Sequence, residues 1–144
     1  MKLSLQIVTP ERIVYEDEVD QVSVTTETGE ITVLPGHIPL VSALRAGEIR
    51  TKDNGKETLL AVSTGFIEVR HGNKIVILAD SAERAEELDI KAIEEARANA
   101  KRMLLEKREL DDVGFAAAAA AMERELARHR VAMKHAKAKG YTSS

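Results

Sequence analysis

The sequence predicts a β + α chain, in which an N-terminal antiparallel β-sandwich is followed by a C-terminal antiparallel hairpin of two helices. Up to about residue 80, apolar residues alternate with polar ones, which is the period of a strand. After residue 81 they recur every three or four residues, as in an amphipathic helix. Six of the eight glycines lie in the first half, where they mark turns. We therefore expect two domains, residues 1–85 and residues 86–144.

Short strands are predicted throughout the first domain. Leu3, Leu5 and Ile7 alternate with polar residues, whereas residues 74–78 include a run that is apolar on both faces. The glycines follow one another at intervals of 7 to 11 residues, close to the turn spacing of sandwiches and small barrels. Residues 53–55 and 71–73 are predicted hairpin turns, because Asn and Gly tolerate a positive φ.

Two helices are predicted in the second domain, over about residues 89–110 and 113–138. An apolar stripe marks the first helix: Ile93, Ala96, Ala100, Met103, Leu104 and Leu110. A second seam marks the other: Phe115, Ala119, Met122, Leu126, His129 and Met133. Residues 111–114 interrupt the pattern, because aspartate caps helices and glycine permits a reversal. The alanine run 116–121 favours helix but buries little area, so the second helix either packs closely or is weakly held and suited to moving.

Composition excludes several classes of protein. The chain has no cysteine, which excludes a disulfide scaffold and a cysteine-ligated zinc site and favours a reducing compartment. The N-terminus alternates in polarity instead of forming the apolar core of a signal peptide. No apolar run approaches the roughly 20 residues that span a bilayer. We expect a soluble chain with no direct membrane insertion, whose membrane association depends on a partner.

Motifs for catalysis and metal binding are absent from the sequence. It contains no Gly-rich phosphate loop and no G-x-S-x-G nucleophile turn. His129 and His135 are six residues apart, about 240° around a helix, and cannot share one metal ion. The acidic stretch 16–20 lacks the glycine turn and the final glutamate of a calcium loop. We expect no catalytic residue, no metal and no obligatory cofactor.

The strongest charge feature is basic. From Arg124 to Lys139 there are six Lys or Arg residues and one acid, Glu125, although the whole chain has a net charge of -3. This run has no interleaved aromatic residues, on which nucleic-acid-binding proteins commonly stack bases. We therefore expect an acidic protein surface as its partner, and no nucleic acid.

Several segments, in order along nearly the whole chain, carry a resemblance to a known family. They are Ile7-Val8-Thr9-Pro10, Tyr15-Glu16 with Val22-Ser23-Val24, Gly29-Glu30-Ile31, Leu34-Pro35-Gly36-His37-Ile38-Pro39-Leu40, Ser63-x-Gly65-Phe66-Ile67-Glu68-Val69 and Ile77-Leu78-Ala79-Asp80-x-Ala82-Glu83-Arg84. Together they make the chain similar to the epsilon subunit of bacterial F-type ATP synthases. The resemblance implies a sandwich of about ten strands and a two-helix hairpin, which is the architecture that the periodicity predicts.

The resemblance implies a non-catalytic rotor subunit of a proton-translocating synthase, at the cytoplasmic face of the bacterial plasma membrane. Its sandwich would hold the γ subunit to the membrane ring of c subunits. The ring contact would fall on Glu30 and on the uncharged loop formed by Leu34, Pro35, Gly36 and His37. Because proline and glycine stiffen and turn this loop, His37 is expected to be a contact or bracing residue and not a catalyst.

The helical hairpin would be the regulatory part. In this family it permits turnover when it is folded against the sandwich, and it hinders ATP hydrolysis when it extends along γ. In the extended state, the resemblance implies that basic residues of the second helix face an acidic loop of the catalytic β subunits. The candidates in this sequence are Arg124, Arg128, Arg130 and Lys134.

A nucleotide site at the base of the hairpin is incomplete. Some family members bind ATP through an Ile/Leu-Asp-x-x-Arg-Ala motif, with a glutamate six residues before the aspartate. Glu83 and Asp89 match this pattern, but Ala92 stands where the arginine belongs. A shifted frame over residues 93–98 recovers an arginine but loses the aspartate and the earlier glutamate. Since alanine cannot replace a bidentate guanidinium, we expect ATP to be at most a weak regulatory ligand. Alternatively, Asp89 caps the first helix.

Two functions outside an ATP synthase stay open. A free-standing adaptor would dimerise through its helical hairpin, although the alanine run gives a weak dimer seam. A nucleotide-sensing module would need the missing arginine. Co-purification with a γ subunit would separate both alternatives from the rotor subunit.

Overall fold

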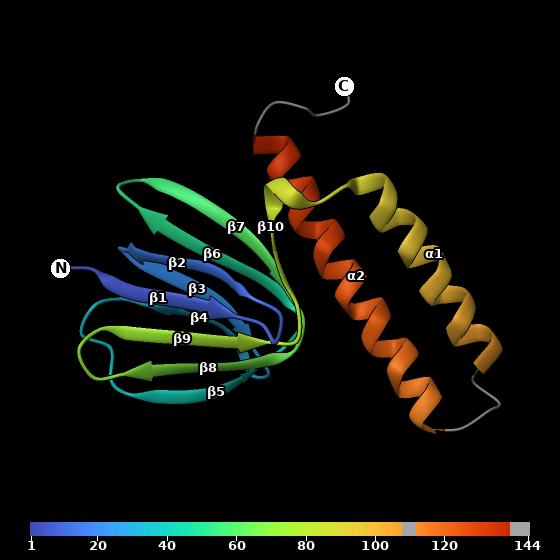
Figure 1. The fold of residues 1–144 in the computed structure, drawn as a ribbon, viewed down its shortest axis with the longest axis horizontal. Coiled ribbons are helices and arrows are strands. Elements are labelled where there is room, and N and C mark those ends of the chain that lie inside the picture. Colours follow the sequence, from blue (N-terminus) through green and yellow to red (C-terminus); the bar gives the residue numbers. More distant parts are fainter. Residues whose placement is uncertain (108–111, 139–144) are drawn as a thin grey trace.

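The computed structural model describes residues 1–107 and 112–138. The chain forms ten strands followed by one turn of 3-10 helix, η1 (Ala85–Glu87), and two α-helices, α1 (Ile90–Lys107) and α2 (Asp112–Ala138). Their arrangement is shown in Figure 1. The strands are β1 (Leu3–Val8), β2 (Ile13–Val19), β3 (Gln21–Thr26), β4 (Gly29–Val33), β5 (Leu40–Leu44), β6 (Gly47–Asp53), β7 (Lys56–Val62), β8 (Gly65–Arg70), β9 (Lys74–Ala79) and β10 (Ala82–Arg84). Most of the predicted interruption at 111–114 falls in α2, but its first residue lies outside the described residues.

The strands form one sheet that folds over into two layers. Their order is β10-β7-β6-β3-β5-β8-β9-β1-β2, with β4 paired to β3. The fold brings β2 into contact with β6 and β10, which closes the sandwich visible in Figure 1. The predicted fold class, a sandwich followed by a helical hairpin, is confirmed. One strand pair, β1 with β9, is parallel, which alternation within a single strand cannot predict.

The core of the sandwich is formed by alternate residues along the strands, whose side chains point inward. In β1, Leu3, Leu5 and Ile7 are at most 1% exposed, and their parallel neighbours Ile75 and Ile77 are fully buried. Branched apolar side chains pack well on a pleated surface, which favours strand over helix here. The alternating pattern therefore predicted the buried face of these strands correctly.

Both predicted hairpin turns are present. Asn54 and Gly55 connect β6 to β7 with φ angles of 53° and 79°. Gly72 and Asn73 connect β8 to β9 with φ angles of 80° and 59°. Positive φ at two successive turn residues matches the right-handed twist of the flanking strands, which explains why asparagine and glycine occupy these positions.

The two helices lie side by side and antiparallel, and α2 is the helix that contacts the sandwich (Figure 1). The stripe predicted on α1 is confirmed at Ile93 and Ala100, which are buried, but Met103 is 40% exposed, and Leu110 lies outside the described residues. The seam predicted on α2 is wrong at Phe115, Leu126 and Met133, which are 46%, 36% and 48% exposed, whereas Met122 is half-buried. The residues that α2 buries are mostly small: Ala118, Glu125, Ala127, Val131 and Ala132. Because α2 packs between α1 and the sheet, close approach on both sides selects small side chains. Within the described residues, neither helix is long and apolar enough to cross a membrane.

Candidate functional site

A small apolar contact holds α2 against the sandwich. Val131 is fully buried and packs with Leu59 and Ala61 of β7 and with Ala85 of η1. Burial of one valine and a few alanine surfaces contributes only a few kcal/mol, at about 25 cal/mol per Å² of apolar area. The polar contacts around this cluster therefore weigh heavily in the docked position of the helix.

Arg128 forms the strongest of these polar contacts. Its Nη2 donates to Oε2 of Glu83 at 2.9 Å, and its Nε lies 2.8 Å from Oε1 of the same carboxylate as an ion-pair contact without hydrogen-bond geometry. Its Nη1 donates to Glu125, at 2.7 Å to Oε2. Burial of the guanidinium lowers the pKa of Arg128, but hydrogen bonding and charge attraction from Glu83 and Glu125 outweigh this and raise it. Arg128 thus bridges α2 and β10 as a permanent cation.

Glu125 shows why this bridge matters. It is 3% exposed, the most buried acidic residue of the described chain. An ionised carboxylate is costly to bury unless cations and donors compensate it. Arg128 supplies that compensation, together with Arg124, whose Nε lies 3.4 Å from Glu125 Oε1. The basic residues of α2 therefore stabilise an acid on their own helix as well as one on the sandwich.

The four basic residues predicted to face β subunits differ in whether they form ion pairs within this chain. Lys134 pairs with Glu48 of β6 at 2.8 Å, so it also contacts the sandwich. Arg130 is exposed, and no ion pair is recorded for it within residues 1–107 and 112–138. In the docked hairpin, Arg124, Arg128 and Lys134 are thus bound to acids of this chain, while Arg130 faces solvent.

The two residues predicted to contact ATP have other partners here. Glu83 is held by Arg128. Asp89 precedes α1, and its Oδ1 accepts the backbone N–H groups of Lys91 at 3.0 Å and Ala92 at 3.4 Å. This is the helix-capping arrangement that was the alternative explanation for Asp89. Binding of ATP by Glu83 and Asp89 stays a prediction.

Arg84, the neighbour of Glu83 in β10, is also engaged. Its guanidinium lies 5.4 Å above the ring of Tyr15 and donates to the backbone carbonyl of Val14 at 3.2 and 3.3 Å. A cation stacked on an aromatic face and bonded to a carbonyl gives up these contacts if it moves to a phosphate.

The predicted loop at residues 34–37 is a tight turn braced from a distant part of the chain. Gly36 has a φ of 88°, and the N–H of His37 donates to the carbonyl of Leu34 at 3.1 Å. The N–H of Gly36 donates to Oδ1 of Asn73, in the β8–β9 turn, at 2.8 Å. His37 Nδ1 lies 2.6 Å from the carbonyl oxygen of Ile38, a local bracing contact.

Glu30 is not brought together with this loop. It is the second residue of β4 and pairs with Arg50 of β6, whereas Leu34 follows the end of β4. Four residues of extended strand separate them by roughly 13 Å. The two parts of the predicted ring contact therefore lie toward opposite ends of one strand.

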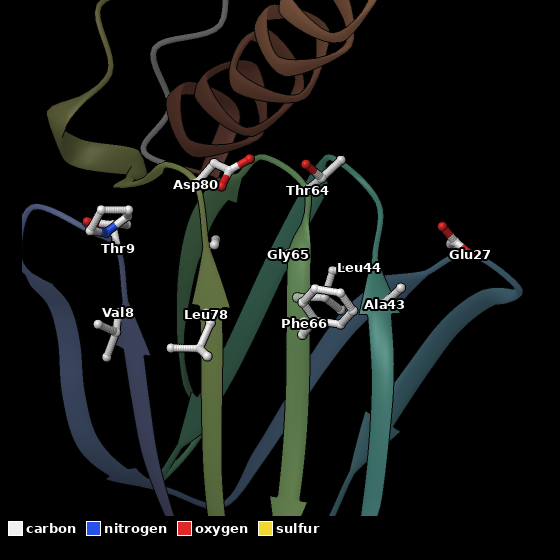
Figure 2. Close-up of a pocket in the computed structure, with 12 residues that line it drawn as sticks. Val8, Thr9, Glu27, Ala43, Leu44, Thr64, Gly65, Phe66, Leu78 and Asp80 are labelled. Carbon is white, nitrogen blue, oxygen red and sulfur yellow. The ribbon is translucent and has the colours of Figure 1, made fainter.

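An exposed apolar row crosses the outer face of the sandwich, and no sequence motif indicated it. Strand register aligns Ala43, Phe66, Leu78 and Val8 across β5, β8, β9 and β1. Phe66 and Leu78 are 57% and 51% exposed. Figure 2 shows both side chains on the face of the sheet, beside the shallow pocket that this row lines. The signal in the sequence was the double-faced apolar pattern of residues 74–78.

Polar and charged residues border one side of this row. Glu27, Thr64 and Asp80 line the same pocket at the strand ends nearest α2 (Figure 2). No group of three or more His, Asp or Glu side chains that could hold a metal ion occurs in the described parts of the chain. The outer face therefore has the apolar centre and polar rim that are typical of a protein contact.

Comparison with known proteins decides the family. Residues 2–85 match the family model described as "ATP synthase, Delta/Epsilon chain, beta-sandwich domain". The chain belongs to the ATP synthase epsilon family. An ATP synthase epsilon chain of Dehalococcoides mccartyi is 44% identical over 136 residues, covering 94% of this chain and 96% of its relative. That of Nitratidesulfovibrio vulgaris is 46% identical over 129 residues, covering 90% and 94%.

Solved structures agree on the fold of the epsilon family. A chain of the Euglena gracilis mitochondrial ATP synthase, in a structure of OSCP, F1 and the c-ring, superposes with a TM-score of 0.74. It is 21% identical and the match covers 94% of this chain and 81% of that chain. A chain from the central stalk and c-ring of the Tetrahymena thermophila mitochondrial ATP synthase gives a TM-score of 0.56 at 14% identity, covering 94% and 96%.

Membership of the epsilon family answers the question of catalysis. Relatives of this chain are ATP synthase epsilon chains, and the epsilon chain is a non-catalytic subunit of the rotary ATP synthase. Membership of this family therefore supports the prediction that the chain has no catalytic activity of its own. The chain is a subunit of that complex, which speaks against the free-standing adaptor and the independent nucleotide sensor.

Proposed function

We propose that this subunit holds γ to the c-ring in the central stalk and restrains ATP hydrolysis through its C-terminal helices. The observation that carries the γ contact is the exposed apolar row of Ala43, Phe66, Leu78 and Val8. Exposed apolar side chains are common singly, but a continuous row across four strands is a feature of protein interfaces. A rigid sheet is also a suitable support for a contact that carries torque.

The γ subunit is the partner proposed for this row because the surface suits a permanent contact. Its centre is an aromatic and a leucine side chain, each about half exposed in the free subunit. Val41 and Ile13 extend the apolar area on the same sheet and are 69% and 52% exposed. Obligate interfaces are more hydrophobic than transient ones, and aromatic residues often form their energetic centre.

The c-ring contact is proposed for Glu30 and for the loop of Leu34, Pro35, Gly36 and His37. Glu30 is exposed and already pairs with a cation, Arg50, so a polar loop of a partner can compete for its carboxylate. The loop presents Leu34, which is 51% exposed, on a turn braced by Asn73. Since Glu30 and the loop lie about 13 Å apart, the contact would extend along β4 instead of forming a single point.

Inhibition is proposed to follow from a change of partner by α2. In the docked hairpin, Arg128 and Lys134 bind Glu83 and Glu48 of the sandwich. Extension along γ would release both cations for the acidic loop of a β subunit. In a bacterium the complex would place this subunit at the cytoplasmic face of the plasma membrane. ATP would act as a weak regulatory ligand at Glu83 and Asp89.

Binding to purified γ tests the proposal. Phe66→Asp and Leu78→Asp are expected to weaken binding at least tenfold, because they place a carboxylate in an apolar interface. Leu105→Asp is the matched control, since Leu105 is 64% exposed on α1 and outside the row. If the sheet variants bound γ as well as the Leu105 variant, the row would not be the γ contact.

For inhibition, alanine at Arg124, Arg128, Arg130 and Lys134 together should accelerate ATP hydrolysis by the reassembled complex, and an unchanged rate would refute that role.

A further inference from the structure

Four charged side chains of alternating sign form a path from β4 to α2. Glu30 pairs with Arg50. The Nε of Arg50 also lies 3.1 Å from Oε1 of Glu48, two residues earlier on the same face of β6. Glu48 in turn pairs with Lys134 of α2, at 2.8 Å to Oε2 and 3.1 Å to Oε1. The path thus begins at the proposed ring contact and ends on the regulatory helix.

The two middle residues of this path are shared. Arg50 divides its guanidinium between two carboxylates, and Glu48 divides its carboxylate between two cations. The side chain of Glu48 is 13% exposed, whereas that of Glu30 is 53% exposed. Charge pairs are screened less where water is excluded, so Glu48 is the member most sensitive to its neighbours. A change in the pairing of Arg50 would therefore alter the charge balance at Glu48, the partner of Lys134.

The docked position of α2 is held by a small contact, so a small change in electrostatic energy can shift the equilibrium between docked and undocked helix. Lys134 lies three residues after Val131, the central apolar contact of α2 with the sandwich. The remaining residues that α2 buries are mainly alanines. With so little apolar area at the contact, the gain or loss of one ion pair changes the ratio of docked to undocked molecules by a measurable factor.

We propose that capture of Glu30 by a cationic group of a partner loosens the docking of α2. When Glu30 is withdrawn, the guanidinium of Arg50 is free to engage both oxygens of Glu48 and competes with Lys134 for them. The uncompensated charge of Arg50 also repels Lys134. The partner chemistry is a lysine or arginine on a protein surface. The biological setting rests on the proposed ring contact at Glu30, but the coupling itself is a property of this chain.

The absence of native cysteine allows a direct test on the full chain. Cysteines introduced at Lys56 and Lys137, both exposed, would carry a donor and an acceptor dye. Lys56 and His135 line one surface cavity, so the dyes are close when α2 is docked. Single-molecule energy transfer then counts docked and undocked molecules. Glu30→Gln should favour the undocked state about twofold, the scale of exposed ion pairs. Glu18→Gln is the matched control, because Glu18 is exposed on β2 and no ion pair is recorded for it in the described residues.

A second variant tests the route. In an Arg50→Gln background, which interrupts the path, Glu30→Gln should have no further effect on docking. The proposal is overturned if Glu30→Gln behaves like Glu18→Gln, or if its effect persists without Arg50. Addition of purified c-ring to the labelled wild type separates the two proposals. If Glu30→Gln loosens α2 but the ring does not, the coupling stands and the ring contact at Glu30 fails. If the ring binds through Glu30 and docking is unchanged, the coupling fails.

Discussion

Arg128 of α2 and Glu83 of β10 form an ion pair, in which Nη2 donates to Oε2 at 2.9 Å and Nε lies 2.8 Å from Oε1. The sequence assigned these residues to different partners, Arg128 to a β subunit and Glu83 to ATP. In the docked hairpin the guanidinium of Arg128 and the carboxylate of Glu83 bind each other, so neither group is available to its proposed external partner. Docking therefore competes with both proposed contacts, and its strength sets how readily either can form.

Loss of the Arg128 side chain should loosen the hairpin. Arg128→Gln leaves the buried Glu125 with only Arg124, 3.4 Å away, and removes both contacts to Glu83. Hydrogen bonds to charged groups contribute about 1.5–3 kcal/mol, so the docking equilibrium should shift by at least tenfold toward the undocked state. Energy transfer between dyes on cysteines at positions 56 and 137 would measure the shift.

Arg130 supplies the control for this prediction. It carries the same charge on the same helix but is exposed in the docked hairpin. Arg130→Gln should leave docking unchanged while weakening inhibition of ATP hydrolysis in the assembled complex. Equal effects of the Arg128 and Arg130 variants on docking would show that net charge, and not the contact with Glu83, holds the helix.

ATP should bind the isolated chain at millimolar concentration or not at all. Glu83 is occupied by Arg128, Asp89 caps α1, and Ala92 provides no cation for the phosphates. Calorimetric titration measures the affinity. Ala92→Arg restores the bidentate donor of the family motif and should tighten binding at least tenfold. Micromolar binding by the wild type would contradict this prediction.

Asn73 should control the order of the loop at residues 34–37. Asn73→Gly keeps the positive φ of this turn position but removes the acceptor for the N–H of Gly36. Amide exchange at Gly36 should accelerate several-fold, which corresponds to about 1 kcal/mol for one hydrogen bond. Asn73→Asp retains an acceptor and should preserve the protection. Identical exchange in the glycine variant and the wild type would rule out this brace.

Gly65 should be intolerant of any side chain. A Cβ at this position would lie 2.0 Å from the carbonyl oxygen of Leu78, so β8 and β9 would have to separate. We expect Gly65→Ala to lower the free energy of unfolding by about 3 kcal/mol or more. Gly47→Ala is the milder comparison, because the nearest atom is the Thr25 hydroxyl at 3.2 Å. Urea denaturation of both variants measures the difference, and equal stabilities would contradict the close approach.

Local periodicity predicted the elements of this fold well, because strands and helices place residues on their buried face at different intervals. It identified the buried face of β1 and the turn at Asn54 and Gly55. It failed for α2, where Phe115 and Met133 were expected inside. A helix that packs closely on two neighbours buries its small residues, and the sequence of one helix does not reveal how many neighbours it has.

The candidate site was predictable only in part for a similar reason. The resemblance pointed to Arg128 and Glu83, yet nothing local showed that residues 45 positions apart would bind each other. The apolar row of Phe66 and Leu78 arises from strand register, which includes the parallel pairing of β1 with β9. Contacts between strands distant in sequence depend on topology, so they became visible only in the folded chain.

The C-terminal helices of this subunit are proposed to restrain ATP hydrolysis by the assembled complex. The most direct measurement compares ATP hydrolysis by complexes reassembled with the full chain and with a chain that lacks residues 111–144. We expect the truncated chain, which keeps the apolar row on the sandwich, to assemble with γ, and its complex to hydrolyse ATP faster. An unchanged hydrolysis rate in a fully assembled complex would contradict the regulatory role.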